Sequence, residues 1–243
     1  MTTLTSPKQS ISQRVDGLDW HKLRAELDTH GFAVTGQVLS GAECSDLAGL
    51  FDDGNFRSTI DMARHRFGEG RYRYFDHPLP GTIADLRGSF YRHLAPIANA
   101  WSELLGTRGD EFPLEHDELL ERCSQAGQER PTPLILRYGK SDWNALHQDL
   151  YGDVYFPFQV LTVLSEPYVD FEGGEFVLLE QRPRAQSRAH VITPPQGAFV
   201  IFPTRERPQQ GKRGYYKVGM KHGVSTVTCG ERTALGVIFH DAG

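Results

Sequence analysis

The chain of 243 residues is predicted to fold as an α+β domain with a jelly-roll-like core and helices on its N-terminal side. Two observations predict this class. Before residue 134 apolar residues recur at helical spacing, whereas after it β-branched and aromatic residues come in short bursts separated by Gly and Pro. Helices followed by many short strands are typical of a barrel or sandwich with helices packed outside.

The N-terminal half predicts more helix than strand. Residues 1–17 offer almost nothing to bury, so we expect a disordered lead-in there. Ser40 has the position of a helix N-cap, with Glu43 three residues later. We expect residues 18–133 to form a mainly helical layer that supports the core and lies on the substrate side. Its helices are predicted over residues 20–30, 41–53, 83–105 and 114–126, with a short strand over 32–34.

The C-terminal half, residues 134–243, is predicted to be the jelly-roll core, and residues 18–243 are predicted to make a single domain. Pro131 and Pro133 close the helical half. The seven expected strands cover residues 134–138, 154–164, 174–180, 190–193, 197–203, 222–228 and 233–240.

The composition excludes several classes of protein. The formal net charge of −5 argues against a generally cationic nucleic-acid binder, although it says nothing about a local patch. Cys44, Cys123 and Cys229 form neither a disulfide framework nor a CxxC motif, which favours a reducing cytoplasm. Nowhere do 18 apolar residues run together, so we expect no membrane span.

His147-x-Asp149 places two metal-binding side chains on one side of an extended segment, because strand side chains alternate. His222 begins a late strand, where a barrel could bring a third ligand to the same place. Two imidazoles and one carboxylate leave open positions on an octahedral ion and suit non-haem Fe(II), while zinc is the competing metal. His116 and Glu118 have the same spacing, but they lie in a predicted helix, so we expect a solvated face there.

Arg232 follows His222 by ten residues, near the start of the final strand and across a turn at Gly230. An odd-length turn would place both side chains on one face of the barrel. An inward arginine is costly unless it meets an anion, and a guanidinium binds a carboxylate bidentately. A metal with open positions and this arginine together indicate a chelating co-substrate with a distal carboxylate. The alternative is an ordinary surface arginine after a turn.

Four ordered motifs make this half resemble the 2-oxoglutarate- and Fe(II)-dependent oxygenases, particularly their prolyl-4-hydroxylase-like branch. The resemblance covers residues 134–240 and implies a double-stranded β-helix, the jelly roll of that superfamily. The motifs are His147-x-Asp149, Phe171-Glu172-Gly173-Gly174-Glu175-Phe176, Phe199-Val200-Ile201-Phe202-Pro203 and His222-x-Val224-x-x-Val227-x-x-Gly230-x-Arg232-x-x-Leu235.

The resemblance implies that His147, Asp149 and His222 bind Fe(II) and that Arg232 binds the C5 carboxylate of 2-oxoglutarate. Tyr138, in the preceding strand, could donate its hydroxyl proton to the same co-substrate. The implied activity is that of a dioxygenase that couples oxidative decarboxylation of 2-oxoglutarate by O2 to hydroxylation or oxidative demethylation of a substrate.

The segment 182–221 holds nine basic residues against one acidic residue, which gives it a charge of +8 while the rest of the chain carries −13. Such asymmetry could mark an anionic partner, and Tyr215 and Tyr216 could stack on bases. The ordinary alternative is a set of solvated loops that pair with acidic helices. A narrower bacterial group of oxygenases, labelled as oxidative demethylases of damaged nucleic acid, is also similar to this arrangement.

Three other functions stay open at this point. The oxygenase could hydroxylate a protein side chain or a small metabolite instead of nucleic acid. A barrel of this kind could also hold a metal or 2-oxoglutarate as a non-catalytic sensor, or bind no metal at all. Turnover of 2-oxoglutarate to succinate separates the enzyme from the other two functions.

Overall fold

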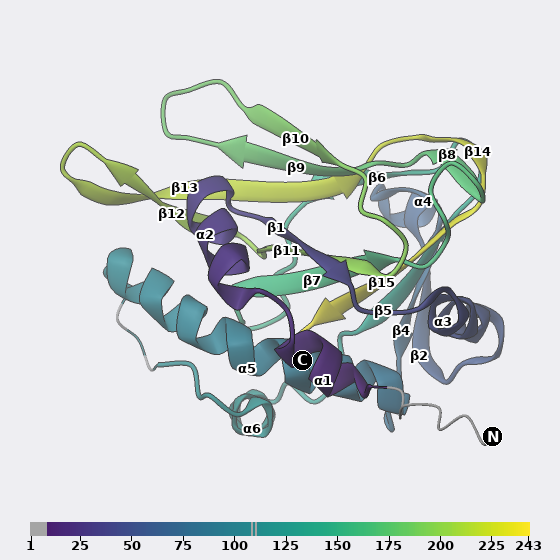
Figure 1. Ribbon diagram of the computed structural model, residues 1–243, viewed down its shortest axis with the longest axis horizontal. Helices are drawn as coiled ribbons and strands as arrows, with labels where there is room; N and C mark the ends of the chain where they lie inside the picture. Colours follow the sequence, from purple (N-terminus) through teal and green to yellow (C-terminus); the bar gives the residue numbers. More distant parts are fainter. Residues whose placement is uncertain (1–8, 108, 110) are drawn as a thin grey trace, which may run out of the picture.

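Two antiparallel sheets face each other in the computed structural model, which describes residues 9–107, 109 and 111–243 (Figure 1). The larger sheet has seven strands in the order β1-β11-β7-β15-β5-β4-β2. In that order the strands are Ala33–Gln37, Ala198–Pro203, Phe158–Val163, Arg232–Ile238, Leu134–Tyr138, Arg71–Phe75 and Phe56–Asp61.

The smaller sheet has the strand order β10-β9-β13-β6-β3, with β12 paired to β13 outside this path. A further pair, β14 with β8, lies at one end of the sandwich (Figure 1). In the same order these strands are Arg188–Ile192, Phe176–Gln181, Gly214–Val224, Trp143–His147, Gly68–Glu69, Glu206–Gly211, Val227–Gly230 and Phe171–Gly173.

The helices other than α4 lie against the outer face of the larger sheet, whereas α4 lies beside β3 of the smaller sheet (Figure 1). Phe90 of α5 packs on Phe199 of β11 with ring centroids 4.9 Å apart. In the described part of the chain, no helix has both the length and the apolarity that crossing a membrane requires. The helices are α1 Ile11–Asp16, α2 Trp20–His30, α3 Gly41–Asp53, α4 Met62–His65, α5 Gly81–Leu104 and α6 His116–Gln125.

Strand β11 reads as an unbroken apolar run because both of its faces are buried. Phe199 and Ile201 belong to the core between the larger sheet and the helices. Val200 and Phe202 belong to a second core between the two sheets. The alternation of strand side chains thus divides one sequence between two cores.

The predicted α+β jelly roll is confirmed, and so are the four predicted helices and the short strand β1. Ser40 caps α3 with a capping box to Glu43, as its position predicts. The mainly helical character of residues 18–133 is wrong over 56–75, because β2 and β4 extend the larger sheet there. The arginines of these strands do not follow the alternation of buried apolar and exposed polar residues that predicts a strand. Arg73 of β4, for example, lies over the ring of Phe51 instead of pointing to solvent.

The predicted lead-in differs from the structure over part of its length. Residues 11–16 form α1, while residues 1–8 lie outside the described residues. Ile11 and Val15, four positions apart, are both buried, and Ser12 Oγ lies 2.8 Å from Ser89 Oγ of α5. Two apolar residues among many polar ones are too weak a pattern to predict this helix.

His116 is buried, so the expectation of a solvated face there is wrong. Its Nε2 donates to the carbonyl oxygen of Phe239 over 2.7 Å, which ties α6 to the end of the chain. Beside it Arg87 forms a buried ion pair with Asp241 over 2.6 Å. Burial, aided by the charge of Arg87, lowers the pKa of His116 to about 3.

The free energy of unfolding is therefore expected to fall as the pH drops from 7 to 5. The folded-state pKa of His116 lies below that of an unfolded chain, so the unfolded state binds more protons in this range. The expected loss from this histidine is about 2 kcal/mol at pH 5. Urea unfolding at the two pH values measures it, and His116→Gln should remove that share; an equal pH dependence in both proteins would contradict the assignment.

Candidate metal and co-substrate site

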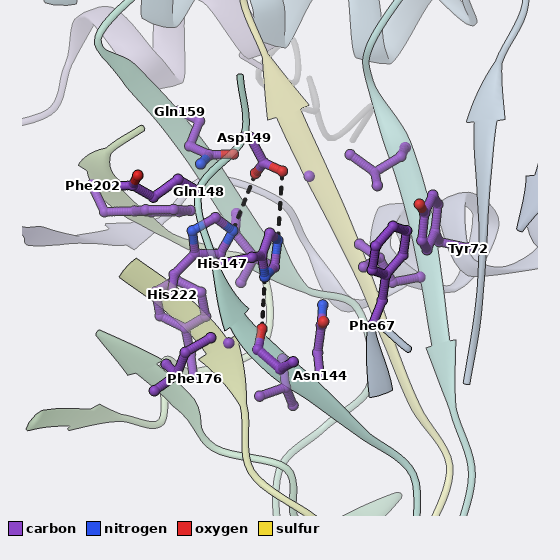
Figure 2. Close-up of a pocket in the computed structure, with 18 of the residues that line it drawn as sticks. Phe67, Tyr72, Asn144, His147, Gln148, Asp149, Gln159, Phe176, Phe202 and His222 are labelled. Carbon is purple, nitrogen blue, oxygen red and sulfur yellow. Dashed lines mark hydrogen bonds and ion pairs between the residues drawn. The ribbon is translucent and has the colours of Figure 1, made fainter. Parts of the chain in front are cut away.

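A cavity of about 390 Å³ opens between the two sheets (Figure 2). Strands β5, β7 and β15 of the larger sheet form one wall, β6 and β13 form the other, and β4 and the turn before β3 close one side. All five residues predicted from the sequence, His147, Asp149, His222, Arg232 and Tyr138, line this one cavity.

The three predicted metal ligands meet at the junction of β6 and β13. His147, the last residue of β6, pairs with His222 of β13 across the sheet, and Asp149 follows two residues after His147. Their ligand atoms all lie within 4.8 Å of one another. Asp149 Oδ1 is 3.5 Å from His147 Nε2, and Asp149 Oδ2 is 3.1 Å from His222 Nε2 (Figure 2).

Both imidazoles turn Nε2 toward the carboxylate. His147 Nδ1 donates to the carbonyl oxygen of Ala145 over 2.7 Å, which leaves the lone pair on Nε2. The ring of His222 packs against those of Phe202 and Phe176, at 4.9 and 5.9 Å between centroids. This orientation of two histidines is the one that metal ligation requires.

Burial lowers the pKa of His222, which favours the neutral imidazole that a metal needs. Burial also opposes ionisation of Asp149, but the two neighbouring histidines outweigh it and hold the pKa of this carboxyl well below its ordinary value. Burial opposes protonation of His147, but the hydrogen bond and charge of Asp149 outweigh it and raise the pKa of that imidazole, so a metal ion would displace its proton on binding. The site therefore offers one anionic oxygen donor and two imidazole nitrogen donors. This donor set suits Fe(II), and it also suits zinc.

Arg232 is 1% exposed, and none of its three guanidinium nitrogens has a hydrogen-bond partner in the described protein. It pairs with Tyr138 across β15 and β5, and its guanidinium carbon lies 5.5 Å from the centre of the tyrosine ring. The alternative of a surface arginine is excluded. A buried cation without a partner, in the same cavity as the metal ligands, fits the distal carboxylate of 2-oxoglutarate.

Gly174 makes room for this arginine. Its φ is +63°, and a Cβ there would lie 2.9 Å from Arg232 Cδ, so a side chain would collide with the guanidinium stem. At Gly173 (φ +72°) a Cβ would lie 2.4 Å from the carbonyl oxygen of Thr226. The GlyGly pair therefore marks a close backbone approach as well as a turn.

Tyr138 is fully buried, and its hydroxyl oxygen accepts a hydrogen bond from Asn144 Nδ2 over 3.2 Å. Burial raises the pKa of Tyr138 to about 12, so the phenol keeps its proton. Because its oxygen already accepts from Asn144, that proton is available to a ligand in the cavity.

Sequence reasoning missed three polar residues of this cavity: Asn144, Tyr151 and Gln159. Tyr151 donates its hydroxyl proton to Asp149 Oδ1 over 2.7 Å. Gln159, on β7 near Asp149 (Figure 2), is 4% exposed and its amide nitrogen has no hydrogen-bond partner in the described protein. The one signal that could have identified Gln159 is its polarity within the apolar run of residues 154–164.

The cavity mouth is mostly apolar. Phe67, Leu146 and Leu150 line it and are 48%, 41% and 46% exposed, and Arg66 stands beside Phe67. Figure 2 shows Phe67 next to Tyr72, across the cavity from the two histidines. Large apolar side chains exposed together around an opening are typical of a surface that binds a ligand.

None of the nine basic residues of segment 182–221 is among the residues that line the cavity. Arg207 and Arg182 pair with Glu180 over 2.7 and 2.5 Å, and Lys217 pairs with Glu206 over 2.5 Å. The segment does contact the cavity lining at Arg205, whose carbonyl oxygen accepts from Gln148 Nε2 over 2.9 Å. The +8 charge is thus partly neutralised within the fold.

A family model, Oxygenase-NA, described as an oxygenase catalysing oxidative methylation of damaged DNA, matches residues 70–242. Two curated relatives, both named as uncharacterized proteins, come from Mycobacterium tuberculosis: MT2286 of strain CDC 1551 / Oshkosh and Rv2227 of strain ATCC 25618 / H37Rv. Each is 50% identical to this chain over 168 residues, which cover 69% of this chain and 72% of the relative.

Solved structures share the fold at low identity. A prolyl-4-hydroxylase of Pseudomonas putida aligns with a TM-score of 0.53 and 15% identity, covering 92% of this chain and 100% of its own. An oxidoreductase of the 2OG-Fe(II) oxygenase family from Burkholderia pseudomallei aligns with a TM-score of 0.54 and 17% identity, covering 92% of each chain. The chain therefore belongs to the Oxygenase-NA family of oxygenases and has the fold of the prolyl-4-hydroxylase-like 2OG-Fe(II) oxygenases.

Proposed function

We propose that His147, Asp149 and His222 hold Fe(II), and that Arg232 and Tyr138 bind 2-oxoglutarate beside it. The observation that carries this proposal is the buried, unpartnered guanidinium of Arg232 in the cavity of the three ligands. When bound, Fe(II) supplies the oxidising chemistry of this class, in which O2 and 2-oxoglutarate yield succinate, CO2 and an oxidised substrate.

The protein's own residues would bind and orient the co-substrate and exclude water from it. Arg232 would receive the C5 carboxylate bidentately, and the hydroxyl of Tyr138 would donate a third hydrogen bond to the same group. Asn144 keeps the Tyr138 hydroxyl in that direction by donating to its oxygen. The apolar walls of β7 and β15 keep water from the buried ion pair that the co-substrate would complete.

Succinate formation tests this proposal directly. Purified protein with Fe(II), ascorbate and 2-oxoglutarate is expected to form succinate slowly without a substrate and faster with the right one. Protein that binds 2-oxoglutarate tightly but never consumes it would favour the sensor alternative. A protein that retains zinc after anaerobic purification with iron would favour the competing metal.

We propose damaged nucleic acid as the substrate, with hydroxylation of a base-attached methyl carbon as the reaction that leads to demethylation. The family description, which names damaged DNA, supports this substrate, and so do Arg66 and Phe67 at the mouth. An aromatic ring beside a cation suits an unpaired base and its phosphate. The apolar rim of Leu146 and Leu150 favours a second candidate, a small apolar metabolite.

Salt dependence separates the two substrates. Methylated single-stranded DNA is expected to bind with an affinity that falls steeply as salt rises, and Arg66→Ala should reduce the slope of log K against log salt by about 0.7. Arg184→Ala is the matched control, because this exposed arginine lies in the turn between β9 and β10 and does not line the cavity. Absence of DNA binding at low salt would remove the nucleic-acid proposal.

A further inference from the structure

Tyr151 lies in the loop between β6 and β7, two residues after Asp149. Its hydroxyl is 2.7 Å from Asp149 Oδ1. An ionised carboxylate only accepts hydrogen bonds, so the phenol must be the donor. One of the two oxygens of the candidate metal ligand is therefore already engaged by the protein.

A second phenol, that of Tyr74, donates a hydrogen bond to the Tyr151 hydroxyl. Tyr74 of β4 is buried, and its hydroxyl donates to the hydroxyl oxygen of Tyr151 over 3.1 Å. The guanidinium of Arg57 covers the ring of Tyr74, 4.3 Å from its centre. Because Tyr151 accepts from Tyr74, its single proton is directed to Asp149.

The number of oxygens that Asp149 gives to the ion decides how many positions stay open. Two imidazoles and one oxygen leave about three positions of an octahedral ion, whereas a bidentate carboxylate leaves about two. Bound 2-oxoglutarate would fill two of them, through its keto and C1 oxygens. Dioxygen would need the third position, so a bidentate Asp149 would block the reaction that we propose.

We infer that Tyr151 is a positioning residue that keeps Asp149 a one-oxygen ligand, through the bond from its hydroxyl to Oδ1. Oδ2, which faces His222 Nε2 over 3.1 Å, is then the oxygen left for the ion. This inference rests on the proposed function, since it concerns the same metal site. The family assignment does not describe the hydrogen bonds from Tyr74 to Tyr151 and from Tyr151 to Asp149.

Tyr151→Phe removes the donor and keeps the ring. Mn(II) is the probe, because water-proton relaxation counts the exchangeable waters on it. In the parent protein 2-oxoglutarate is expected to leave one inner-sphere water on Mn(II), and in Tyr151→Phe none. Before 2-oxoglutarate is added, the inner-sphere relaxation of the variant is expected to be about one third lower.

Two further variants keep the test sharp. Tyr155→Phe, the same change in the same loop, is the matched control, because Tyr155 is not among the residues that line the cavity, and its relaxation should equal that of the parent. Tyr74→Phe removes the hydrogen bond from Tyr74 to the Tyr151 hydroxyl and should shift the relaxation in the same direction by a smaller amount. This variant therefore tests the role of Tyr151 even if Tyr151→Phe fails to fold.

The possible results separate this inference from the proposed function. Equal water counts in the parent and in Tyr151→Phe, with Mn(II) bound to both, would overturn the role of Tyr151 and leave the metal site intact. A parent protein that binds no Mn(II) would overturn the metal site, and the role of Tyr151 with it. Loss of turnover by about 10–100-fold with 2-oxoglutarate binding retained should accompany the lost water.

Discussion

Replacing His147 by Ala is expected to abolish metal binding and to lower succinate formation by about 1,000-fold or more. His147 supplies one of the three donors, and the ion it helps to hold is worth several kcal/mol of transition-state stabilisation. Its side chain is 37% exposed, so its removal should leave the fold intact. Metal content after dialysis and succinate formation are the two measurements.

His190→Ala is the matched control for this variant. His190 lies on β10, packs its ring 5.2 Å from that of Phe32, and is not among the residues that line the cavity. It should retain both metal and activity. Succinate formation by His147→Ala at the parental rate would contradict the metal site.

Replacing Arg232 by Met is expected to weaken 2-oxoglutarate binding by about 100-fold or more while metal binding is retained. Truncating one member of a buried charge-assisted pair typically costs about 2–5 kcal/mol. Calorimetric titration of the metal-loaded protein with 2-oxoglutarate measures the loss. Equal affinity for 2-oxoglutarate in parent and variant would contradict the co-substrate site.

The same variant should be more stable than the parent when 2-oxoglutarate is absent. Arg232 is a buried cation without a partner in the described protein, and burial lowers its pKa, so removing its charge removes a desolvation cost. We expect the free energy of unfolding to rise by about 1 kcal/mol or more. Added 2-oxoglutarate should stabilise the parent more than Arg232→Met at the same concentration.

Arg87→Met is expected to lower the free energy of unfolding, the opposite of the change expected for Arg232→Met. Arg87 is as deeply buried as Arg232, but it is paired with Asp241 and donates to the carbonyl oxygens of Ile238 and Phe239. Its removal leaves a buried carboxylate without its cation and should cost about 3–5 kcal/mol. Destabilisation by both variants would show that Arg232 has a partner inside the protein.

The metal ligands could be predicted because the sequence pattern that identifies them spans only a few residues. The alternation of side chains in an extended segment is enough to place His147 and Asp149 on one side. A strand late in the sequence, followed by a turn of odd length, is enough to place His222 and Arg232 on one face. The structure brings these residues together, whereas their roles in binding Fe(II) and 2-oxoglutarate stay predictions. His116 shows the limit of such reasoning, because helical spacing does not reveal that a helix end is buried.

Residues that act through distant contacts could not be predicted. Tyr74 and Tyr151 are 77 positions apart, and nothing in either segment indicates that their hydroxyls meet. Strands β2 and β4 were missed for a related reason, since Arg57 and Arg73 donate to backbone carbonyl oxygens and stack on aromatic rings within the fold instead of marking a solvent face. A strand at the edge of a sheet has its pattern set by its neighbours.

The sequence by itself determined the class of fold, the three candidate metal ligands and the candidate partner of the distal carboxylate, because short-range periodicity and side-chain chemistry carry that information. The tertiary structure alone decided which charges are neutralised, which are left without a partner, and which hydroxyls reach Asp149. Those properties depend on the pairing of strands far apart in the chain. They explain why Arg207 of the basic segment is a structural residue while Arg232 faces the cavity alone.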